Sequence, residues 1–234
     1  MKKKMKWIGL GLLGLILVAV IGVLVWTQLT YGPTEEALGY AAEATEVDNR
    51  LEFGDPESEV GIILYPGAKV DKEAYAYYGS RLAEEGIFVA IPSLRLNLGI
   101  LDIDAAETII DAHPNVERWI VAGHSLGGSA ASGFALENEE RVDGVIFLAS
   151  YPISSMAESE LRVLSISGEF DGLATPADIE ASRDNIPRDA TFHQIEGGNH
   201  ANFGMYGPQD GDNDSPLSAK QQLDETIEHI LDWL

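Results

Sequence analysis

The hydrophobic pattern after residue 47 consists of short apolar runs that alternate with amphipathic segments. Continuous apolar runs are typical of strands buried on both faces of a parallel sheet. They predict an edge strand or hairpin arm at 47–53, buried strands at 60–65 and 87–91, and further strands at 116–122, 145–149, 162–167 and 191–195. Helical periodicity and boundary residues predict helices at 72–85, 98–112, 126 to about 140, 176–185 and 217–234. This alternation predicts an α/β protein with a mostly parallel sheet and helices on both faces.

The N-terminal segment has a different pattern. Residues 7–29 are apolar and carry no charge, and about 20 such residues suffice to cross a bilayer as a helix. Lysines precede the run, and the first acidic residue after it is Glu35. Because basic residues favour the cytoplasmic side, we expect a cytoplasmic basic tail at 1–6, a transmembrane anchor at 7–29, a stalk at 30–46 and an extracytoplasmic domain at 47–234 in the cell membrane.

A cleaved signal peptide is the competing interpretation of this segment, and it would make the protein secreted. The apolar run is longer than the 7–15 residues usual for such peptides. No Ala-x-Ala site follows it, and Ala41 and Ala42 come too late for cleavage. The uncleaved anchor is therefore favoured, and a mature protein beginning beyond Tyr31 would contradict it.

Composition narrows the possible chemistry. The 234 residues contain no cysteine, which excludes disulfides, a thiolate nucleophile, a cysteine-ligated metal and a lipidated N-terminal cysteine. The formal net charge is −23, although four of the 15 basic residues lie within the first six positions. The remaining surface repels nucleic acid and anionic membrane. We therefore expect no nucleic-acid partner, and membrane contact through the N-terminal helix only.

The candidate nucleophile lies in Gly123-His124-Ser125-Leu126-Gly127, between a predicted strand and a run of small residues at 129–133. A serine on a sharp strand-to-helix turn has a strained backbone and an exposed hydroxyl. The turn requires almost no side chain two residues before and two residues after it, and glycine satisfies this at both places. Ser125 is the predicted nucleophile. An ordinary glycine-rich turn is the alternative.

Two further loops supply a candidate acid and base. Reactive groups in parallel sheets gather at the carboxyl ends of the strands. Asp171 follows the strand at 162–167, and His200 follows the strand at 191–195. His200 would accept the proton of Ser125, and Asp171 would fix the tautomer of the imidazole. Glu169 and Asp178 are rival acids.

Two backbone groups are predicted to stabilise an oxyanion. One is the N–H of Leu126, which directly follows the nucleophile. The other belongs to the turn at 66–68, where Ala68 is the preferred donor. Loss of one such donor typically costs about 3 kcal/mol of transition-state stabilisation.

The motif at 123–128, Asp171 and His200 resemble the α/β-hydrolase superfamily, in its esterase, lipase and dienelactone-hydrolase-like branch. The chain is most similar to small single-domain bacterial members with a Tyr-Pro-Gly oxyanion turn, a Ser-Gly-x-x-Asp-Gly-Leu-Ala-Thr-Pro acid loop and a Gly-Gly-Asn-His-Ala-x-Phe-Gly histidine loop. These motifs stand here at 65–67, 167–176 and 197–204. The resemblance covers residue 60 to the end and implies the α/β-hydrolase fold with Ser, Asp and His as the catalytic triad. Many relatives have His-Gly in place of Tyr-Pro-Gly, and dienelactone hydrolases proper use a cysteine.

The segment between two predicted strands, residues 150–161, is too short for the cap domain that lipases and many epoxide hydrolases carry there. An uncapped pocket is open and shallow, which favours short-chain esters. We therefore expect a serine carboxylesterase that works through an acyl-enzyme on Ser125, without cofactor or metal. A thioesterase, lactonase or peptidase on the same triad, or a catalytically idle membrane-tethered binding protein, are the alternatives.

Other polar residues receive a structural interpretation. Lys69 and Arg95 lie near predicted active-site loops and could meet an anionic substrate, but solvated or paired side chains are the commoner outcome. The acidic run at 210–214 suggests calcium, yet Ser215 and Gln221 break the EF-hand pattern. A packing or surface role is expected for four histidines: His113, His124, His193 and His229.

Overall fold

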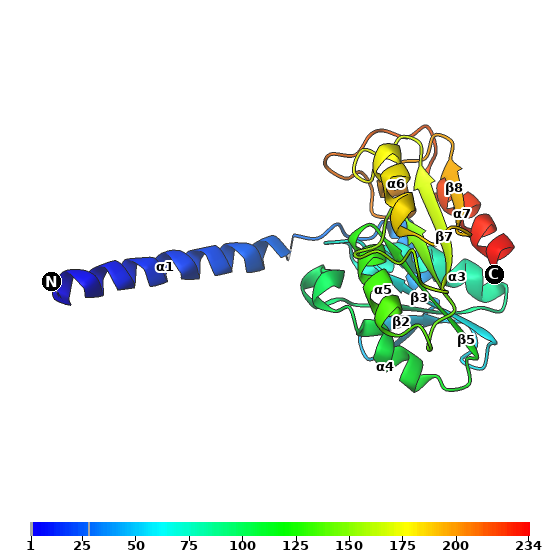
Figure 1. Ribbon diagram of the computed structural model, residues 1–234, viewed down its shortest axis with the longest axis horizontal. Coiled ribbons are helices and arrows are strands. Elements are labelled where there is room, and N and C mark those ends of the chain that lie inside the picture. The colour runs from blue at the N-terminus through cyan, green and yellow to red at the C-terminus, as the bar shows by residue number, and fades with distance from the viewer. Residues whose placement is uncertain (1, 28) are drawn as a thin grey trace.

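The central sheet of the computed structural model has the strand order β1-β2-β4-β3-β5-β6-β7-β8 (Figure 1). The structure describes residues 2–27 and 29–234. The strands are β1 Thr45–Val47, β2 Arg50–Phe53, β3 Val60–Tyr65, β4 Phe88–Pro92, β5 Arg118–His124, β6 Gly144–Leu148, β7 Arg162–Gly168 and β8 Thr191–Ile195. β1 and β2 form an antiparallel hairpin at one edge, and the strands from β4 to β8 run parallel. The mostly parallel sheet predicted from the apolar runs is confirmed.

Helices cover both faces of this sheet. The helices of the domain are α2 Glu35–Ala41, α3 Ala76–Glu84, α4 Ala105–Ala112, α5 Leu126–Glu137, α6 Pro176–Ser182 and α7 Ala219–Trp233. The helix α1 Lys2–Thr27 precedes them and lies outside these layers (Figure 1). Alternate residues of a strand point to opposite faces. In β3, Ile62 and Leu64 join the core under α3 and α7, whereas Ile63 and Tyr65 join the core under α4 and α5. Burial on both faces explains why β3 is continuously apolar.

The helix predicted at 98–112 is shorter in the structure and comprises only α4. Two single 3₁₀ turns, Arg95–Asn97 and Gly99–Leu101, occupy the preceding stretch. Leu98, with φ and ψ of −131° and 106°, and Asp102, with −148° and 43°, have backbone conformations that a right-handed helix cannot contain. Packing against α5 fixes this path, because a Cβ on Gly99 would lie 2.9 Å from the Cβ of Ala130.

The segment expected as a stalk lies against the domain. Tyr31 donates its N–H to the carbonyl of Lys69 at 2.7 Å, and Thr34 donates its N–H to Met205 at 2.8 Å. Thr34 also caps α2 with its side chain. Ala37 of α2 is fully buried in the core under α3. These contacts make residues 31–41 part of the folded unit.

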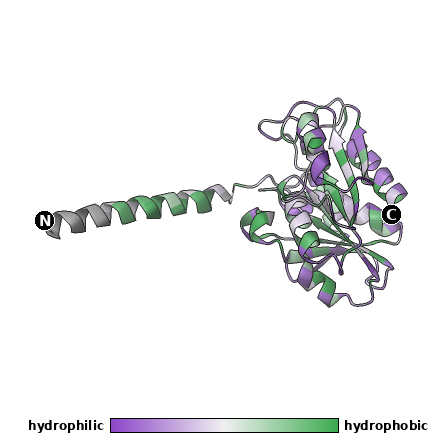
Figure 2. Cartoon of the chain, in the orientation of Figure 1, coloured by the Kyte–Doolittle hydropathy of each residue, from purple (hydrophilic) through white to green (hydrophobic). Residues whose placement is uncertain are grey.

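The N-terminal helix α1 projects away from the domain (Figure 1) and is strongly apolar where its hydropathy is drawn (Figure 2). The side chains of residues 1–10 and 27–28 lie outside the described part of the structure. Within the described part, no helix has the length and hydropathy needed to cross a membrane. The anchor predicted at 7–29 stays a prediction.

Candidate active site

Ser125 lies on a sharp turn between β5 and α5, as the glycine spacing predicts. Its φ and ψ are 53° and −127°, a conformation that L-residues avoid. A Cβ on Gly123 would lie 2.4 Å from the backbone of Gly127, and a Cβ on Gly127 would lie 2.3 Å from the carbonyl of Pro66. Ser150 donates its hydroxyl to the carbonyl of Ser125 at 2.6 Å and secures the turn.

The predicted acid and base are paired. His200 Nδ1 lies 2.9 Å from Asp171 Oδ2, and both residues are buried. The other carboxylate oxygen of Asp171 accepts the N–H groups of Leu173 and Ala174 at 2.8 Å and 2.7 Å. These bonds orient the carboxylate toward the imidazole. Within the described residues, His200 Nε2 has no hydrogen-bond partner, and His200 lines the same cavity as Ser125.

The two rival acids have other partners. Glu169 accepts the N–H of Gly197 at 2.8 Å. Asp178 forms a capping box with Thr175 at the start of α6. Neither carboxylate makes a hydrogen bond with His200 in the described structure, which favours Asp171 as the acid.

The turn at 66–68 lies directly against the nucleophile turn, since a side chain on Gly127 would meet Pro66 and Tyr65. The N–H of Gly67 donates to Tyr75 Oη at 3.0 Å, so the N–H of Ala68 stays the preferred donor from this turn. Leu126 is the first residue of α5, and a helix N-terminus favours a negative charge. The assignment of Leu126 and Ala68 to an oxyanion hole stays a prediction.

A cavity of about 370 Å³ opens at Ser125 and His200. Its other lining residues are Leu126, Ser129, Ala149, Ser150, Tyr151, Leu173 and Ala174. The loop between β6 and β7 contains no helix or strand, so this loop builds no cap over the cavity. A hydroxyl on a strained turn, a buried acid–base pair and a helix N-terminus are the groups that acyl transfer to a serine requires.

Residues 61–224 match the alpha/beta hydrolase family. The chain belongs to this family. The match covers the oxyanion turn, the nucleophile turn and both loops that carry the acid and the base, and it confirms the resemblance inferred from their motifs. No curated protein matches the sequence.

Solved structures of other hydrolases share this α/β-hydrolase architecture. An esterase from Thermogutta terrifontis is 14% identical, with a TM-score of 0.58 over 82% of this chain and 96% of the other. A monoacylglycerol lipase from Paleococcus ferrophilus is 14% identical, with a TM-score of 0.60 over 79% and 98%. A bacterial membrane phospholipase A is 15% identical, with a TM-score of 0.61 over 100% and 98%. At 14–15% identity, these similarities show that the chain shares the fold of these proteins and show nothing further.

A buried Tyr–His pair packs beside His200, the candidate base of this α/β-hydrolase, and no sequence pattern signals it. Tyr75 Oη lies 2.8 Å from His124 Nδ1, and the ring of His124 lies 4.6 Å from the ring of His200. The same hydroxyl accepts the N–H of Gly67. Tyr75 therefore joins the oxyanion turn to the residue that precedes the nucleophile. The expectation that His124 packs beside the site is confirmed.

Burial, and secondly the proximity of His200, holds the pKa of His124 well below its usual value of 6.5. A depressed histidine pKa means that the unfolded chain binds a proton first as the pH falls. Neutral His124 makes its full contribution to the free energy of unfolding above about pH 6.5. This contribution is lost as the pH falls below that value. Between pH 6.5 and 5.5 we expect the wild type to lose about 1 kcal/mol more unfolding free energy than His124→Gln. Urea titrations at the two pH values measure this, and equal losses would contradict it.

The acidic run at 210–214 has a positioning role that the sequence did not reveal. Asp212 Oδ1 accepts the N–H of Gly172 at 3.0 Å, and Asp212 Oδ2 accepts the N–H of Ala201 at 2.8 Å. These donors directly follow Asp171 and His200 in the chain. One carboxylate therefore holds the acid loop and the base loop together. No group of three or more metal-ligating side chains is found among the described residues.

Replacing this carboxylate should disturb the acid–base geometry without touching substrate. Asp212→Ala removes both loop bonds, and misplacing catalytic groups by about 1 Å can cost a hundredfold. We expect kcat on a small ester to fall about tenfold to a hundredfold while KM changes little. Asp212→Asn keeps one acceptor and should lose less. The exposed Asp214→Ala is the matched control, and a similar loss there would contradict the role of Asp212.

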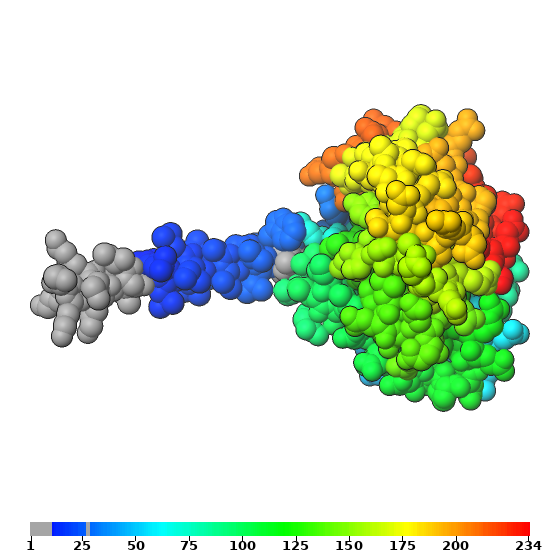
Figure 3. Space-filling view, in the orientation of Figure 1, coloured from blue at the N-terminus to red at the C-terminus, as the bar shows by residue number. Residues whose placement is uncertain are grey.

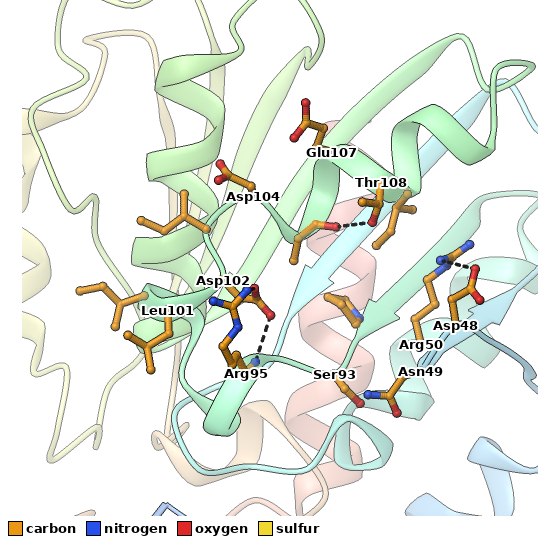
Figure 4. A pocket seen from close by; sticks show the side chains of 15 residues that line it. Asp48, Asn49, Arg50, Ser93, Arg95, Leu101, Asp102, Asp104, Glu107 and Thr108 are labelled. Atoms are coloured by element: carbon orange, nitrogen blue, oxygen red, sulfur yellow. Dashed lines mark hydrogen bonds and ion pairs between the residues drawn. The ribbon is translucent and has the colours of Figure 1, made fainter. Parts of the chain in front are cut away.

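The two cationic residues near the site have other partners. Lys69 Nζ lies 4.3 Å from the ring centre of Trp26. Arg95 lies in a separate hollow of about 560 Å³ beyond the end of β4, where its guanidinium is 2.9 Å from Asp102 (Figure 4). Neither side chain lines the Ser125 cavity. The paired or surface role is therefore the better interpretation.

The three remaining histidines lie away from Ser125. His113 Nε2 is 2.9 Å from Glu52 Oε1. The rings of His193, on β8, and His229, on α7, stack with centres 3.9 Å apart. Burial and the neighbouring His229 lower the pKa of His193. These contacts agree with a packing role for all three.

Proposed function

We propose that this α/β-hydrolase is a serine carboxylesterase that acts on small or short-chain esters, without cofactor or metal. One observation carries the proposal: Ser125 on its strained turn and the buried His200–Asp171 pair meet at one cavity without a cap. The similar structures include an esterase and a monoacylglycerol lipase, and these activities support the ester bond as the target.

The first half of the reaction forms an acyl-enzyme. The hydroxyl oxygen of Ser125 attacks the ester carbonyl, and His200 Nε2 takes the hydroxyl proton. Asp171 stabilises the imidazolium through Nδ1. The N–H groups of Leu126 and Ala68 donate to the carbonyl oxygen as it becomes negative. The tetrahedral intermediate then expels the alcohol, which takes the proton back from His200.

The second half restores the enzyme. A water molecule attacks the acyl carbonyl while His200 Nε2 accepts one of its protons. The carbonyl oxygen returns to the same two N–H donors. Collapse of the intermediate breaks the ester bond to Ser125, whose oxygen recovers the proton from His200. The net products are a carboxylic acid and an alcohol.

A fluorophosphonate probe tests this proposal directly. We expect one covalent adduct, on the peptide that contains Ser125, and loss of p-nitrophenyl acetate hydrolysis in proportion to labelling. Absence of the adduct would support a catalytically idle fold. A matched panel with the same acyl group as an ester, thioester, lactone or amide measures the preferred bond. A higher kcat/KM for the thioester would replace the carboxylesterase proposal with a thioesterase, the activity named for another similar structure.

We further propose that the domain lies on the outer side of the cell membrane. The charge-free apolar run behind an N-terminal lysine cluster supports this placement. Exposure of the domain to protease added to intact cells is the expected result. Protection of the domain until lysis would contradict it.

A further inference from the structure

The exposed apolar side chains of the domain gather at one end of the sheet. Beyond residue 38, six large apolar residues of the described structure are 39–47% exposed. They are Ile100, Leu101, Tyr151, Ile153, Phe170 and Leu173, and we call them the apolar rim. The first two follow β4, the next two follow β6 and the last two follow β7. All six therefore lie in loops at the carboxyl ends of parallel strands, where Ser125 and His200 also lie.

The N-terminal helix leaves the domain at this same end. Lys69, one residue after the oxyanion turn, contacts Trp26 of α1. Tyr31 donates its N–H to the carbonyl of Lys69. Thr34 donates its N–H to the carbonyl of Met205, five residues after His200. In Figure 3 the blue helix meets the domain between the green segment and the orange segment that follows His200. The apolar helix and the active-site mouth thus share one face.

The apolar surface of α1 surrounds the whole helix. Its large apolar side chains from Leu12 to Val23 are between 48% and 69% exposed, and residues 11–26 contain no charged residue. A groove on a partner protein covers one side of a helix, whose other side is then polar. Lipid hydrocarbon covers every side equally. Lipid is therefore the environment that fits this helix.

We propose that the face carrying Ser125 rests on a lipid surface, and that the esters hydrolysed at Ser125 are held in that surface. The proposal rests on the esterase function proposed above and names its substrate class. Leu173 and Tyr151 belong both to the apolar rim and to the lining of the Ser125 cavity. An acyl chain that leaves the lipid would therefore meet these two apolar side chains at the cavity. The net charge of −23 favours an uncharged lipid surface over an anionic one.

Site-specific fluorescence tests the orientation. The chain contains no cysteine, so single-cysteine variants of the full protein can each carry one environment-sensitive dye. We expect phosphatidylcholine vesicles to shift the emission of dyes at Leu101→Cys and Ile153→Cys to shorter wavelength. The dye at Glu139→Cys should not shift, because this exposed residue follows α5 at the opposite end of the sheet. Equal responses at all three positions, or none at 101 and 153, would overturn the orientation.

Kinetics test the substrate class. The double variant Leu101→Ser/Ile153→Ser changes rim residues that do not line the Ser125 cavity. We expect its hydrolysis of a short-chain acyl ester of a lipid held in phosphatidylcholine vesicles to fall about tenfold, with p-nitrophenyl acetate hydrolysis unchanged. If the double variant and the wild type hydrolyse the vesicle ester at equal rates, the lipid proposal is refuted and the esterase proposal is unaffected. A fluorescence shift at Leu101→Cys and Ile153→Cys, together with a wild type that hydrolyses neither ester, would refute the esterase function instead. Self-association in place of vesicle binding would assign α1 to a second copy.

Discussion

Ser125→Ala should reduce the hydrolysis of p-nitrophenyl acetate by about a millionfold, to the level of the assay background. The expected loss is this large because no other described hydroxyl combines a strained turn, an adjacent helix N-terminus and the buried His200–Asp171 pair. Without the Ser125 hydroxyl, water is the only nucleophile that His200 can activate against the ester. Initial rates with purified full-length protein measure the effect. The variant should unfold at the wild-type temperature, because the hydroxyl of the half-buried Ser125 makes no hydrogen bond in the described structure.

Ser129→Ala is the matched control for this substitution. Ser129 lies four residues further along α5 and lines the same cavity, but its hydroxyl donates to the carbonyl of Tyr151 at 2.8 Å. That bond commits its proton to the backbone, so we expect activity within a fewfold of wild type. A large loss for Ser129→Ala together with retained activity for Ser125→Ala would identify Ser129 as the nucleophile.

The strands were the most predictable part of the fold. The run at 60–65 matches β3 at both ends, because a strand buried on two faces admits few polar residues. The predicted strand at 191–195 also matches β8 at both ends, although this edge strand is only partly buried. The helix predicted at 98–112 failed in its first half. There the close approach of Gly99 to α5, a contact between segments far apart in the sequence, overrides the local helical pattern.

The same distinction separates the predictable and unpredictable parts of the site. Ser125 and the loops of Asp171 and His200 follow from local motifs and their order along a parallel sheet. The roles of Tyr75 and Asp212 do not, because each arises from contacts between distant segments: Tyr75 with His124, and Asp212 with both catalytic loops. Neither residue stands in a pattern that distinguishes it from a buried tyrosine or a surface aspartate. Contacts between segments far apart in the sequence, rather than the local motif, therefore position His200, the candidate base.

Asp171→Asn should reduce kcat on the same ester about ten-thousandfold with little change in stability. One oxygen of Asp171 accepts the N–H groups of Leu173 and Ala174, and the asparagine carbonyl will keep these two bonds. The amide NH₂ then faces His200 Nδ1, which must accept its hydrogen bond. The imidazole proton consequently moves to Nε2, the nitrogen that has to accept the proton of Ser125. The variant therefore holds its base in the wrong tautomer within an intact loop.

Glu169→Gln separates this electronic effect from loop disruption. Glu169 lies in the same loop and accepts the N–H of Gly197, a bond that glutamine can keep through its carbonyl oxygen. We expect near-wild-type kcat for this variant, and thermal unfolding of both variants close to that of the wild type. If Glu169→Gln instead lost the activity and Asp171→Asn kept it, Glu169 would be the acid. A fall in unfolding temperature for Asp171→Asn alone would mean that the carboxylate mainly holds the loop. The tautomer argument therefore requires a lost kcat together with an intact fold.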